Sequence, residues 1–416
     1  MPDSPCPTPI SHTPLMSPQG AAVILGHSIK AGELAIPIAP SKINMFGPRG
    51  ACLISENGPL WVADTGHHRL LGWRNIPVTD YQPADWVIGQ PDFYHEGQNA
   101  KGIAGRATFS VPTGICKFGE GLAVADAWNH RVLIWKNLPE DNNVPADLVL
   151  GQANFNDNQA NRGQKDAAAN TLNWCYGVFS IRNQLFVADT GNRRVLIWHQ
   201  LPEENGQPAD LVLGQPDMIS HNENGGDRPS ASSMRWCHDI TLWGEHLVVT
   251  DAGNNRVMIW EGIPTANNTP CKVVLGQKNF TAVEMNQGVY FPNASSLSMP
   301  YGVAAIHNQT QTKIQTKTQN KIQTKTQNQN QDWLLVADTA NSRLLAWEKP
   351  LSIESLHGKT ADIAIGQNNF QSKGENRDYG LPTRDSLNWS YGVSTCGKTV
   401  VISDSGNNRI LLWKTT

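Results

Sequence analysis

The sequence is poor in charged residues and has no excess of either sign. Asp, Glu, Lys and Arg make up 17% of its 416 residues, below the usual quarter, and the formal net charge is −3. Without a basic surface to neutralise phosphates, this balance argues against nucleic acid or an anionic membrane as a partner. No apolar run approaches the length of about 18 residues that a membrane span requires.

Cysteine is scarce and irregularly spaced. The seven cysteines are an odd number, and no two of them have the CxxC spacing of many zinc and redox sites. This usage is typical of free thiols in a reducing compartment. The Pro- and Ser-rich start of the chain lacks the basic segment and apolar segment of a secretory signal. We therefore expect residues 1–20 to form a disordered leader, and the protein to be cytoplasmic.

No segment carries a long helical periodicity, and a ten-residue motif recurs six times instead. In each copy an Arg follows the Asp by five residues, and a Trp follows the Arg by four. A fixed long period is typical of repeat architectures. The copies are DTGHHRLLGW from Asp64, DAWNHRVLIW from Asp126, DTGNRRVLIW from Asp189, DAGNNRVMIW from Asp251, DTANSRLLAW from Asp338 and DSGNNRILLW from Asp404.

One interval between copies is longer than the others. The copies begin 62, 63, 62, 87 and 66 residues apart, and the interval of 87 contains a Gln, Thr, Lys and Asn tract of 25 residues, 307–331. The tract has almost nothing apolar to bury. We expect it to be a disordered low-complexity insertion in a loop of the fifth repeat.

Short runs of Val, Ile and Leu, bounded by Gly, Asn and Pro, predict four strands in each repeat. Four short antiparallel strands make one blade of a β-propeller. The last strand ends in Gly-Gln in five repeats, but the sixth repeat stops before it, and residues 23–27 (VILGH) supply a matching strand. The prediction is an all-β, six-bladed propeller over residues 21–416, closed by an N-terminal strand that completes the last blade.

The repeat resembles a known family. Asn129, His130 and Arg131 come close to the tripeptide that names the NHL repeats, and the wider pattern P-x-G followed by VAD-x-x-N-x-R is similar to NHL-repeat β-propellers. The later ADLVLGQPDM resembles a bacterial subgroup with long repeats that end in LGQPDF. The resemblance extends over residues 21–416 and implies the propeller fold. NHL propellers include lyases, sugar or peptide binders, RNA binders and protein scaffolds, so the resemblance does not select a function.

The Asp and Arg of the repeated turn allow a catalytic interpretation and a structural one. Six equivalent catalytic sites on one ring would be unusual, whereas Asp can accept turn N–H groups and Arg can pair with it or with backbone carbonyls. We favour the structural interpretation, and expect the Gly-Gln glutamines to bond backbone groups. We expect His67, His68 and His130, in or beside the turns, to be surface residues. The Trp residues that end the motif are expected to pack between blades: Trp73, Trp135, Trp198, Trp260, Trp347 and Trp413.

Function is expected where the repeats differ. The variable position of the P-x-G pattern lies on each inner strand, so its six residues should surround one partly solvated mouth of the central channel. Such a mouth could hold a small ligand, a sugar or a peptide end. The alternative is that the Trp and Met residues just upstream pack beneath the loops. The ring residues are Arg49, Thr113, Tyr176, His238, Tyr301 and Tyr391, and the upstream residues are Trp174, Trp236, Met299 and Trp389.

A metal site is a weaker hypothesis. His238 with Cys175 and Cys237 on neighbouring blades could bind a soft metal, but the two cysteines also suit small buried positions. The resemblance to lyase-type NHL propellers implies several metal-binding His residues, and the ring has one. His238 is also the one ring residue expected to titrate near neutral pH. No nucleophile–base triad or phosphate loop is present, so we predict no catalytic residues, no metal and no cofactor.

The loops after each Gly-Gln are long and rich in Asn, Gln, Gly and Ser, and should cover the face that carries the channel mouth. Loops on a rigid scaffold commonly bind partners. The leading hypothesis is a monomeric, non-enzymatic scaffold that binds a protein partner, or a small molecule or sugar, through this face. An assembly factor for another complex is one form of it. The alternative is a lyase-like or hydrolase-like enzyme with its site at the channel mouth.

Overall fold

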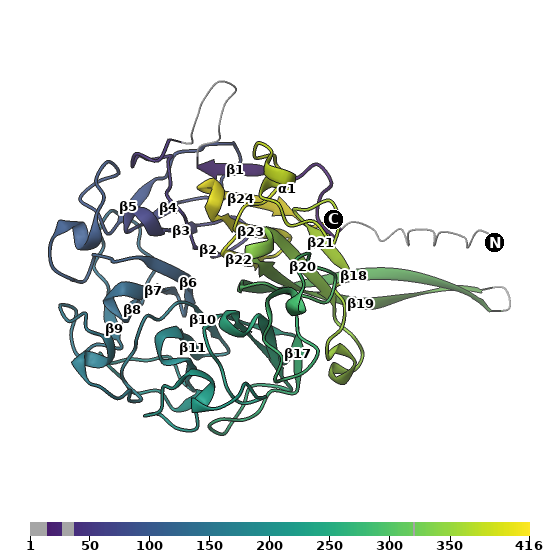
Figure 1. Cartoon of the computed structure of the whole chain (residues 1–416). Helices are drawn as coiled ribbons and strands as arrows, with labels where there is room; N and C mark the ends of the chain where they lie inside the picture. Colours follow the sequence, from purple (N-terminus) through teal and green to yellow (C-terminus); the bar gives the residue numbers. More distant parts are fainter. Residues whose placement is uncertain (1–14, 27–36, 319–320) are drawn as a thin grey trace.

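The computed structural model describes residues 15–26, 37–318 and 321–416. Their strands form six four-stranded antiparallel sheets, arranged as blades around a central channel (Figure 1). This confirms the predicted all-β, six-bladed propeller. Every helix in these ranges is only about a turn long, so none of them could cross a membrane.

Each blade runs from an inner strand at the channel to an outer strand at the edge of the ring. Blade one contains β2 (Gly50–Leu53), β3 (Leu60–Asp64), β4 (Arg69–Trp73) and β5 (Trp86–Ile88). Blade two contains β6 (Pro112–Phe118), β7 (Gly121–Asp126), β8 (Arg131–Trp135) and β9 (Leu148–Leu150). Blade three contains β10 (Val178–Ile181), β11 (Gln184–Asp189), β12 (Arg194–Trp198) and β13 (Leu211–Leu213).

The second half of the ring repeats this order. Blade four contains β14 (Cys237–Trp243), β15 (His246–Asp251), β16 (Arg256–Trp260) and β17 (Val273–Leu275). Blade five contains β18 (Pro300–Thr318), β19 (Lys321–Asp338), β20 (Arg343–Glu348) and β21 (Ile363–Ile365). Blade six contains β22 (Gly392–Cys396), β23 (Thr399–Asp404), β24 (Arg409–Lys414) and β1 (Val23–Gly26).

Short helical turns connect these strands. One 3-10 turn follows the second strand of each blade: η1 (Thr65–His67), η3 (Ala127–Asn129), η5 (Thr190–Asn192), η7 (Ala252–Asn254), η9 (Thr339–Asn341) and η11 (Ser405–Asn407). The long loops between blades contain η2 (Gln98–Lys101), η4 (Ala160–Gly163), η6 (Glu223–Gly226), η8 (Met285–Gly288) and α1 (Asn376–Tyr379). The turn η10 (Ile353–Leu356) precedes β21.

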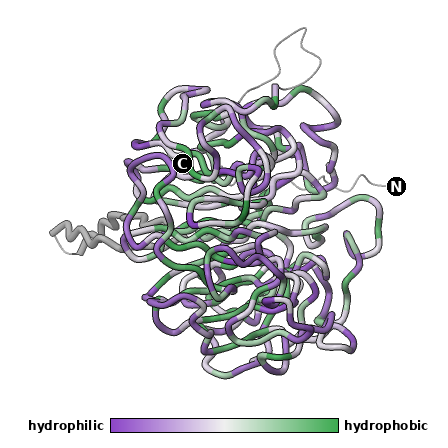
Figure 2. The backbone as a smooth tube through the Cα atoms, turned by 90° about the vertical axis from the view of Figure 1, so that its left-hand side faces the viewer, coloured by the Kyte–Doolittle hydropathy of each residue, from purple (hydrophilic) through white to green (hydrophobic). Residues whose placement is uncertain are grey.

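The apolar cores lie between neighbouring blades. One such core joins Ala123 and Ile134 of blade two to Leu185 and Leu196 of blade three, all of them fully buried. Successive side chains of a strand point to opposite faces, and each face meets a neighbouring blade, so the strands are apolar almost throughout. Seen edge-on, apolar strand segments alternate with hydrophilic loops (Figure 2).

The Trp residues that end each motif belong to these cores, as the sequence predicted. All six are at most 4% exposed, and each indole N–H donates to a backbone carbonyl, as Trp198 does to Gln207 at 3.1 Å. A buried indole needs such a partner for its N–H group. The other five are Trp73, Trp135, Trp260, Trp347 and Trp413.

The N-terminal strand closes the ring, as predicted. β1 pairs antiparallel with β24, from Val23 opposite Leu412 to Gly26 opposite Arg409. Because β1 is the fourth and outermost strand of the sheet that contains β24, blade six combines strands from both ends of the described chain.

Residues 15–20 differ from the disordered leader that we expected. Leu15 and Met16 are buried, and the carbonyl of Ser17 accepts the Trp413 indole N–H at 2.8 Å. In the other blades a loop between the third and fourth strands supplies this carbonyl. In blade six the segment before β1 supplies the carbonyl instead. These residues are therefore held in place by the Trp413 indole, which corresponds to the indole that a nearby loop binds in the other blades. Residues 1–14 lie outside the described residues.

The Gln, Thr, Lys and Asn tract also differs from expectation. It lies between the first two strands of blade five, as an insertion, but β18 and β19 continue through it and project from the ring (Figure 1). Backbone pairing runs from Asn308 opposite Gln331 to Thr318 opposite Lys321. A ladder of this kind is held by backbone hydrogen bonds, so it can extend an existing hairpin without apolar side chains.

Candidate functional site

The Asp and Arg of the repeated turn form a buried ion pair in every blade. In blade three, Arg194 Nε donates to Asp189 Oδ2 at 2.7 Å, and its terminal nitrogens donate to the carbonyls of Met218 (2.6 Å) and Thr171 (3.1 Å). Asp189 also accepts the backbone N–H of Asn173 at 2.7 Å. These charges are occupied by one another and by the backbone, which supports the structural interpretation.

The turn also ties each blade to the loop before it. Asn192 donates to Asp189 at 2.7 Å, and exchanges two amide hydrogen bonds with Asn161 of the preceding loop, at 2.8 and 3.0 Å. Gln152 of the Gly-Gln dipeptide donates to three carbonyls, including that of Gln159 at 2.9 Å. The glutamines thus serve the backbone, as we expected from the sequence.

The three turn histidines are more buried than the surface positions that we expected for them. His67 is fully buried, with its two ring nitrogens 2.7 Å from Asp64 and 2.6 Å from the Ile38 carbonyl. His68 and His130 are half-buried and accept backbone N–H groups of the next blade through Nδ1, at 3.0 and 2.8 Å. Their left-handed backbone conformation directs the imidazole toward that blade, and burial lowers the pKa of both.

The structure brings five of the six predicted ring residues together at one end of the channel. The His238 ring centroid lies 4.4 Å from that of Tyr176 and 4.2 Å from that of Tyr301. Tyr301 lies 4.7 Å from Tyr391, and the Arg49 guanidinium lies 4.6 Å from the Tyr391 ring. We call Arg49, Tyr176, His238, Tyr301 and Tyr391 the aromatic ring.

Two expectations about these positions change. Thr113 does not join the aromatic ring, because its hydroxyl donates to the Tyr176 carbonyl at 2.7 Å and so links two blades. The mouth is also less solvated than we expected. Tyr176, His238 and Tyr301 are 5%, 2% and 8% exposed, since large side chains converging from the inner strands fill this end of the channel.

The upstream residues Trp174, Trp236, Met299 and Trp389 are half-buried, each two positions before a member of the aromatic ring in the sequence. Trp174 packs edge-on against two of its members, with ring centroids 6.4 Å from Tyr176 and 6.1 Å from His238. Trp174, Met299 and Trp389 have positive φ, and each donates its N–H to a turn side chain of the preceding blade. Their positions are therefore set by contacts between blades, and each keeps part of its surface available.

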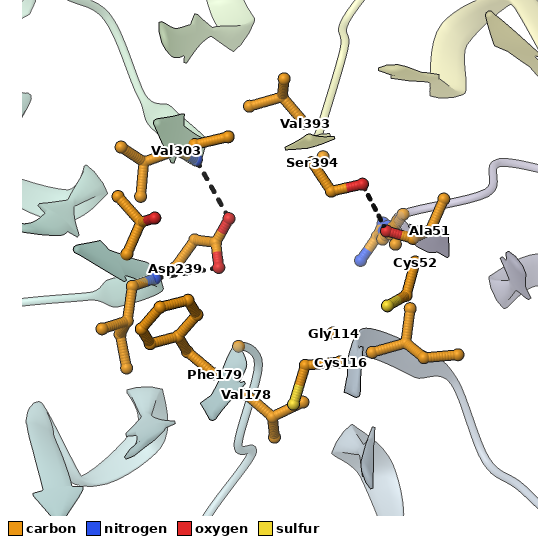
Figure 3. Close-up of a pocket in the computed structure, with 18 of the residues that line it drawn as sticks. Ala51, Cys52, Gly114, Cys116, Val178, Phe179, Asp239, Val303, Val393 and Ser394 are labelled. Atoms are coloured by element: carbon orange, nitrogen blue, oxygen red, sulfur yellow. Dashed lines mark hydrogen bonds between the residues drawn. The ribbon is translucent and has the colours of Figure 1, made fainter. Parts of the chain in front are cut away.

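Below the aromatic ring the channel holds a cavity of about 300 Å³, to which all six inner strands contribute (Figure 3). Most side chains in its wall carry no charge, among them Cys52, Cys116, Phe179 and Ser394. The cavity is at the small end of the range of ligand pockets, about 300–1,000 Å³.

One residue of this cavity was not recognised from the sequence. Five blades have Gly directly after the ring position, and a Cβ there would lie less than 3.0 Å from a backbone oxygen of the next blade. Blade four has Asp239 instead. Its carboxylate accepts the N–H of Val303 in the next blade at 3.0 Å and that of Ile240 at 2.9 Å (Figure 3). The signal in the sequence was the break in the P-x-G pattern, which reads Cys-His-Asp in blade four.

The charge states of this region follow from burial. Burial raises the pKa of the Asp239 carboxyl from 3.8 to about 7, although two backbone N–H groups favour its charged form. Burial, together with the Arg49 charge, lowers the pKa of His238 to about 3. His238 is therefore neutral at pH 7, and the group that titrates near neutral pH is Asp239 rather than His238.

The structure does not bring the candidate metal ligands together. The Cys175 and Cys237 thiols donate to the carbonyls of Arg131 and Arg194 at 3.1 Å, within apolar cores, and burial raises the pKa of both. Among the residues that the structure describes, no group of three or more His, Cys, Asp or Glu side chains could hold a metal ion. The cysteines in these ranges are free thiols.

No protein-family model matches the chain, and neither does any curated protein. Among solved structures, hydrazine synthase from Kuenenia stuttgartiensis aligns over 93% of this chain and 99% of its own, at 10% identity and a TM-score of 0.48. A gluconolactonase from Xanthomonas campestris aligns over 96% and 98%, at 10% identity and a TM-score of 0.44. Virginiamycin B lyase from Staphylococcus aureus aligns over 90% and 97%, at 11% identity and a TM-score of 0.39. Similarity this low says nothing about function, which must be inferred from the chain's own residues.

Proposed function

We propose that the chain is an NHL-type binding propeller, a cytoplasmic monomer that holds a protein partner on the loops above the aromatic ring. The supporting observation is a group of apolar side chains on two long loops, each more than half exposed. The loop between β17 and β18 leads into Tyr301, and the loop between β21 and β22 leads into Tyr391. The exposed side chains are Met285, Val289, Tyr290, Phe291, Tyr379 and Leu381.

The two loops contact each other. Lys373 Nζ donates to the Tyr290 carbonyl at 3.0 Å and lies 3.5 Å from the centroid of its ring. Tyr290 packs edge-on against Phe291, with centroids 4.9 Å apart. Exposed aromatic residues that gather beside polar loops are typical of protein-binding surfaces. We therefore expect the partner to present an apolar segment to this surface.

The test is affinity purification from the native cell with the double variant Tyr290→Ser, Phe291→Ser. Both side chains are exposed, at 72% and 63%, so the variant should melt like the unmodified chain. A partner identified with the unmodified chain, and rebound by it as a purified protein, should bind the variant at least about tenfold more weakly, because aromatic anchors dominate such interfaces.

The matched control is Val78→Ser with Leu351→Ser. These side chains are at least as exposed but lie in loops between the third and fourth strands of their blades. The control should retain the partner. Equal loss of the partner in both variants, or full retention by the loop variant, would show that this surface does not bind it. Recovery of only a second copy of the chain would also contradict the proposal.

The enzyme alternative is favoured by one observation, Asp239. A cavity carboxyl whose pKa is about 7 can both accept and donate a proton at neutral pH, as general acid–base catalysis requires. If the channel is a lyase-like or hydrolase-like site, Asp239→Asn should abolish any turnover found with the unmodified chain. Turnover that survives this substitution would exclude Asp239 as the catalytic group.

A further inference from the structure

Among the described residues, three with charged side chains line the central cavity: Asp239, Arg49 and Lys117. Lys117 is exposed, whereas Asp239 and Arg49 are half-buried, and within the described residues neither of these two forms an ion pair. By contrast, the charges of every repeated turn are paired. A charge withdrawn from water without a partner is costly, so it is rarely kept without a compensating function.

Asp239 is not required by the architecture. The other five blades close against their neighbours with Gly at this position, and each tolerates no side chain there. The two backbone N–H groups that Asp239 accepts occupy only part of its capacity, since a carboxylate has about four acceptor sites. The remaining acceptor sites of this residue, in the cavity wall, suit a cationic group.

Arg49 is likewise peculiar to its blade, since the other ring positions carry Thr, Tyr or His. Its guanidinium lies 4.6 Å from the Tyr391 ring and 6.0 Å from the Tyr176 ring. Aromatic faces stabilise a cation without using its in-plane N–H donors, and apart from the Tyr176 hydroxyl no described group pairs with the Arg49 donors. Those donors match the paired oxygens of a carboxylate or phosphate.

A third polar group in the same wall lies next to Arg49. The Tyr176 side chain lines the cavity and is buried, and apart from the Arg49 guanidinium within reach of it, its hydroxyl has no hydrogen-bond partner in the described part of the chain. A hydroxyl has one donor and two acceptor sites, so this group keeps capacity for a ligand oxygen bound at Arg49.

We propose that the central channel binds a small zwitterion, whose ammonium group pairs with Asp239 and whose carboxylate or phosphate group pairs with Arg49. The neutral wall between these groups would cover the short carbon chain of the ligand. A cavity of about 300 Å³ limits the ligand to a small molecule. This site is independent of the loop surface proposed for the protein partner.

The experiment measures binding by titration calorimetry with the unmodified chain. Two series serve as probes: ω-amino carboxylates of increasing chain length, and ω-aminoalkyl phosphates of the same lengths. One length in one series should bind best, and at least about tenfold tighter than the matched alkylamine or alkyl carboxylate that has only one charge. The preferred series tells whether the oxyanion is a carboxylate or a phosphate.

Asp239→Gly gives blade four the residue that the other blades have, so it should fold. It should bind the best zwitterion no more tightly than the single-charge acid, while Asp239→Asn serves as a second variant of similar size. Arg49→Thr, with the residue of blade two, should reduce binding to that of the amine. Glu245→Gln removes an acid that is 72% exposed outside the cavity, and should bind like the unmodified chain.

Two results would overturn the proposal. One is the absence of binding by every member of both series to the folded, unmodified chain. The other is binding that persists unchanged in Asp239→Gly or Arg49→Thr, which would place the zwitterion elsewhere. Loss of the protein partner in the loop variant has no bearing on either result, so the two proposals fail separately.

Discussion

The repeated turns and the central channel treat buried charge in opposite ways. In each turn the Asp and Arg are at most 1% exposed and lie 2.7–2.9 Å apart, with further hydrogen bonds to the backbone. In the channel, Asp239 and Arg49 occur once each, on blades four and one, and remain unpaired within the described residues. Charges that are paired occur in every repeat, whereas the unpaired charges stand at positions where one repeat differs from the others.

This difference separates structure from function within one fold. A group that every blade needs must be satisfied by partners that every blade has, as Arg194 is by Asp189 and three carbonyls. A group that binds a ligand must keep hydrogen-bonding or charge-pairing capacity free for it, and one such group in the whole propeller is enough. Variants can break or sharpen this comparison, and their effects on stability should decrease from the turns to the aromatic ring.

The largest effect is expected from Arg194→Ala. The substitution leaves the Asp189 carboxylate buried without its cation and removes donors from three carbonyls, which should cost about 3–5 kcal/mol of unfolding free energy. Urea denaturation followed by tryptophan fluorescence measures it. Arg182→Ala, which breaks an exposed ion pair with Glu245, is the control and should leave the transition in place. A small loss for Arg194→Ala would mean that the turn network is not essential.

The second effect concerns Asp239 and pH. Its folded-state pKa, about 7, lies above the ordinary 3.8, so the folded state holds a proton that the unfolded state has released. The stabilisation is complete below pH 3.8 and is lost as pH rises to about 7. In this window the unmodified chain should lose about 1.4 kcal/mol per pH unit relative to Asp239→Asn.

The titration of neighbouring groups does not account for this difference in stability. His238 has a pKa of about 3 and Tyr301 one of about 12, burial raises the pKa of Cys116, and Arg49 stays charged. In the folded state none of them changes charge between pH 4 and 7, and the unfolded-state titration of His238 is the same in both proteins and cancels in their difference. Denaturation curves collected across this range for both proteins give the difference directly. Parallel stability profiles would show that Asp239 is ionised throughout and therefore compensated.

The sequence predicted the part of the molecule that repeats. Asp, Arg and Trp at fixed spacing identified the strands and the turn, and the missing sixth Gly-Gln strand pointed to closure by residues 23–27, of which 23–26 form β1. Alignment of the P-x-G pattern also placed Tyr176, His238 and Tyr301 at the channel, because equivalent residues of a repeat occupy equivalent places in every blade.

The sequence could not predict what depends on contacts across the ring. The burial of the aromatic ring follows from the way six strands converge, and that convergence has no local signal. His67 is buried by a segment distant in the chain, which includes Ile38. Leu15 is buried where the N-terminal segment packs against the C-terminal end of the described chain. Asp239 was visible as a departure from Gly, but its meaning requires knowing that the other blades have no room for a Cβ there.

The smallest effect is expected within the aromatic ring itself, from Tyr176→Phe. Apart from the nearby Arg49 guanidinium, its hydroxyl has no partner within the described residues, so removing it should lower the unfolding free energy by only about 0.5 kcal/mol. Thr113→Val is the matched comparison, because it removes a hydroxyl that donates to the Tyr176 carbonyl at 2.7 Å and should cost about 1 kcal/mol. Urea denaturation at one pH measures both. If Tyr176→Phe costs as much as Thr113→Val, the Tyr176 hydroxyl is held by a bound water and its capacity is not free for a ligand. The channel would then be compensated like the turns, and the contrast between the two regions would rest on Asp239 and Arg49 alone.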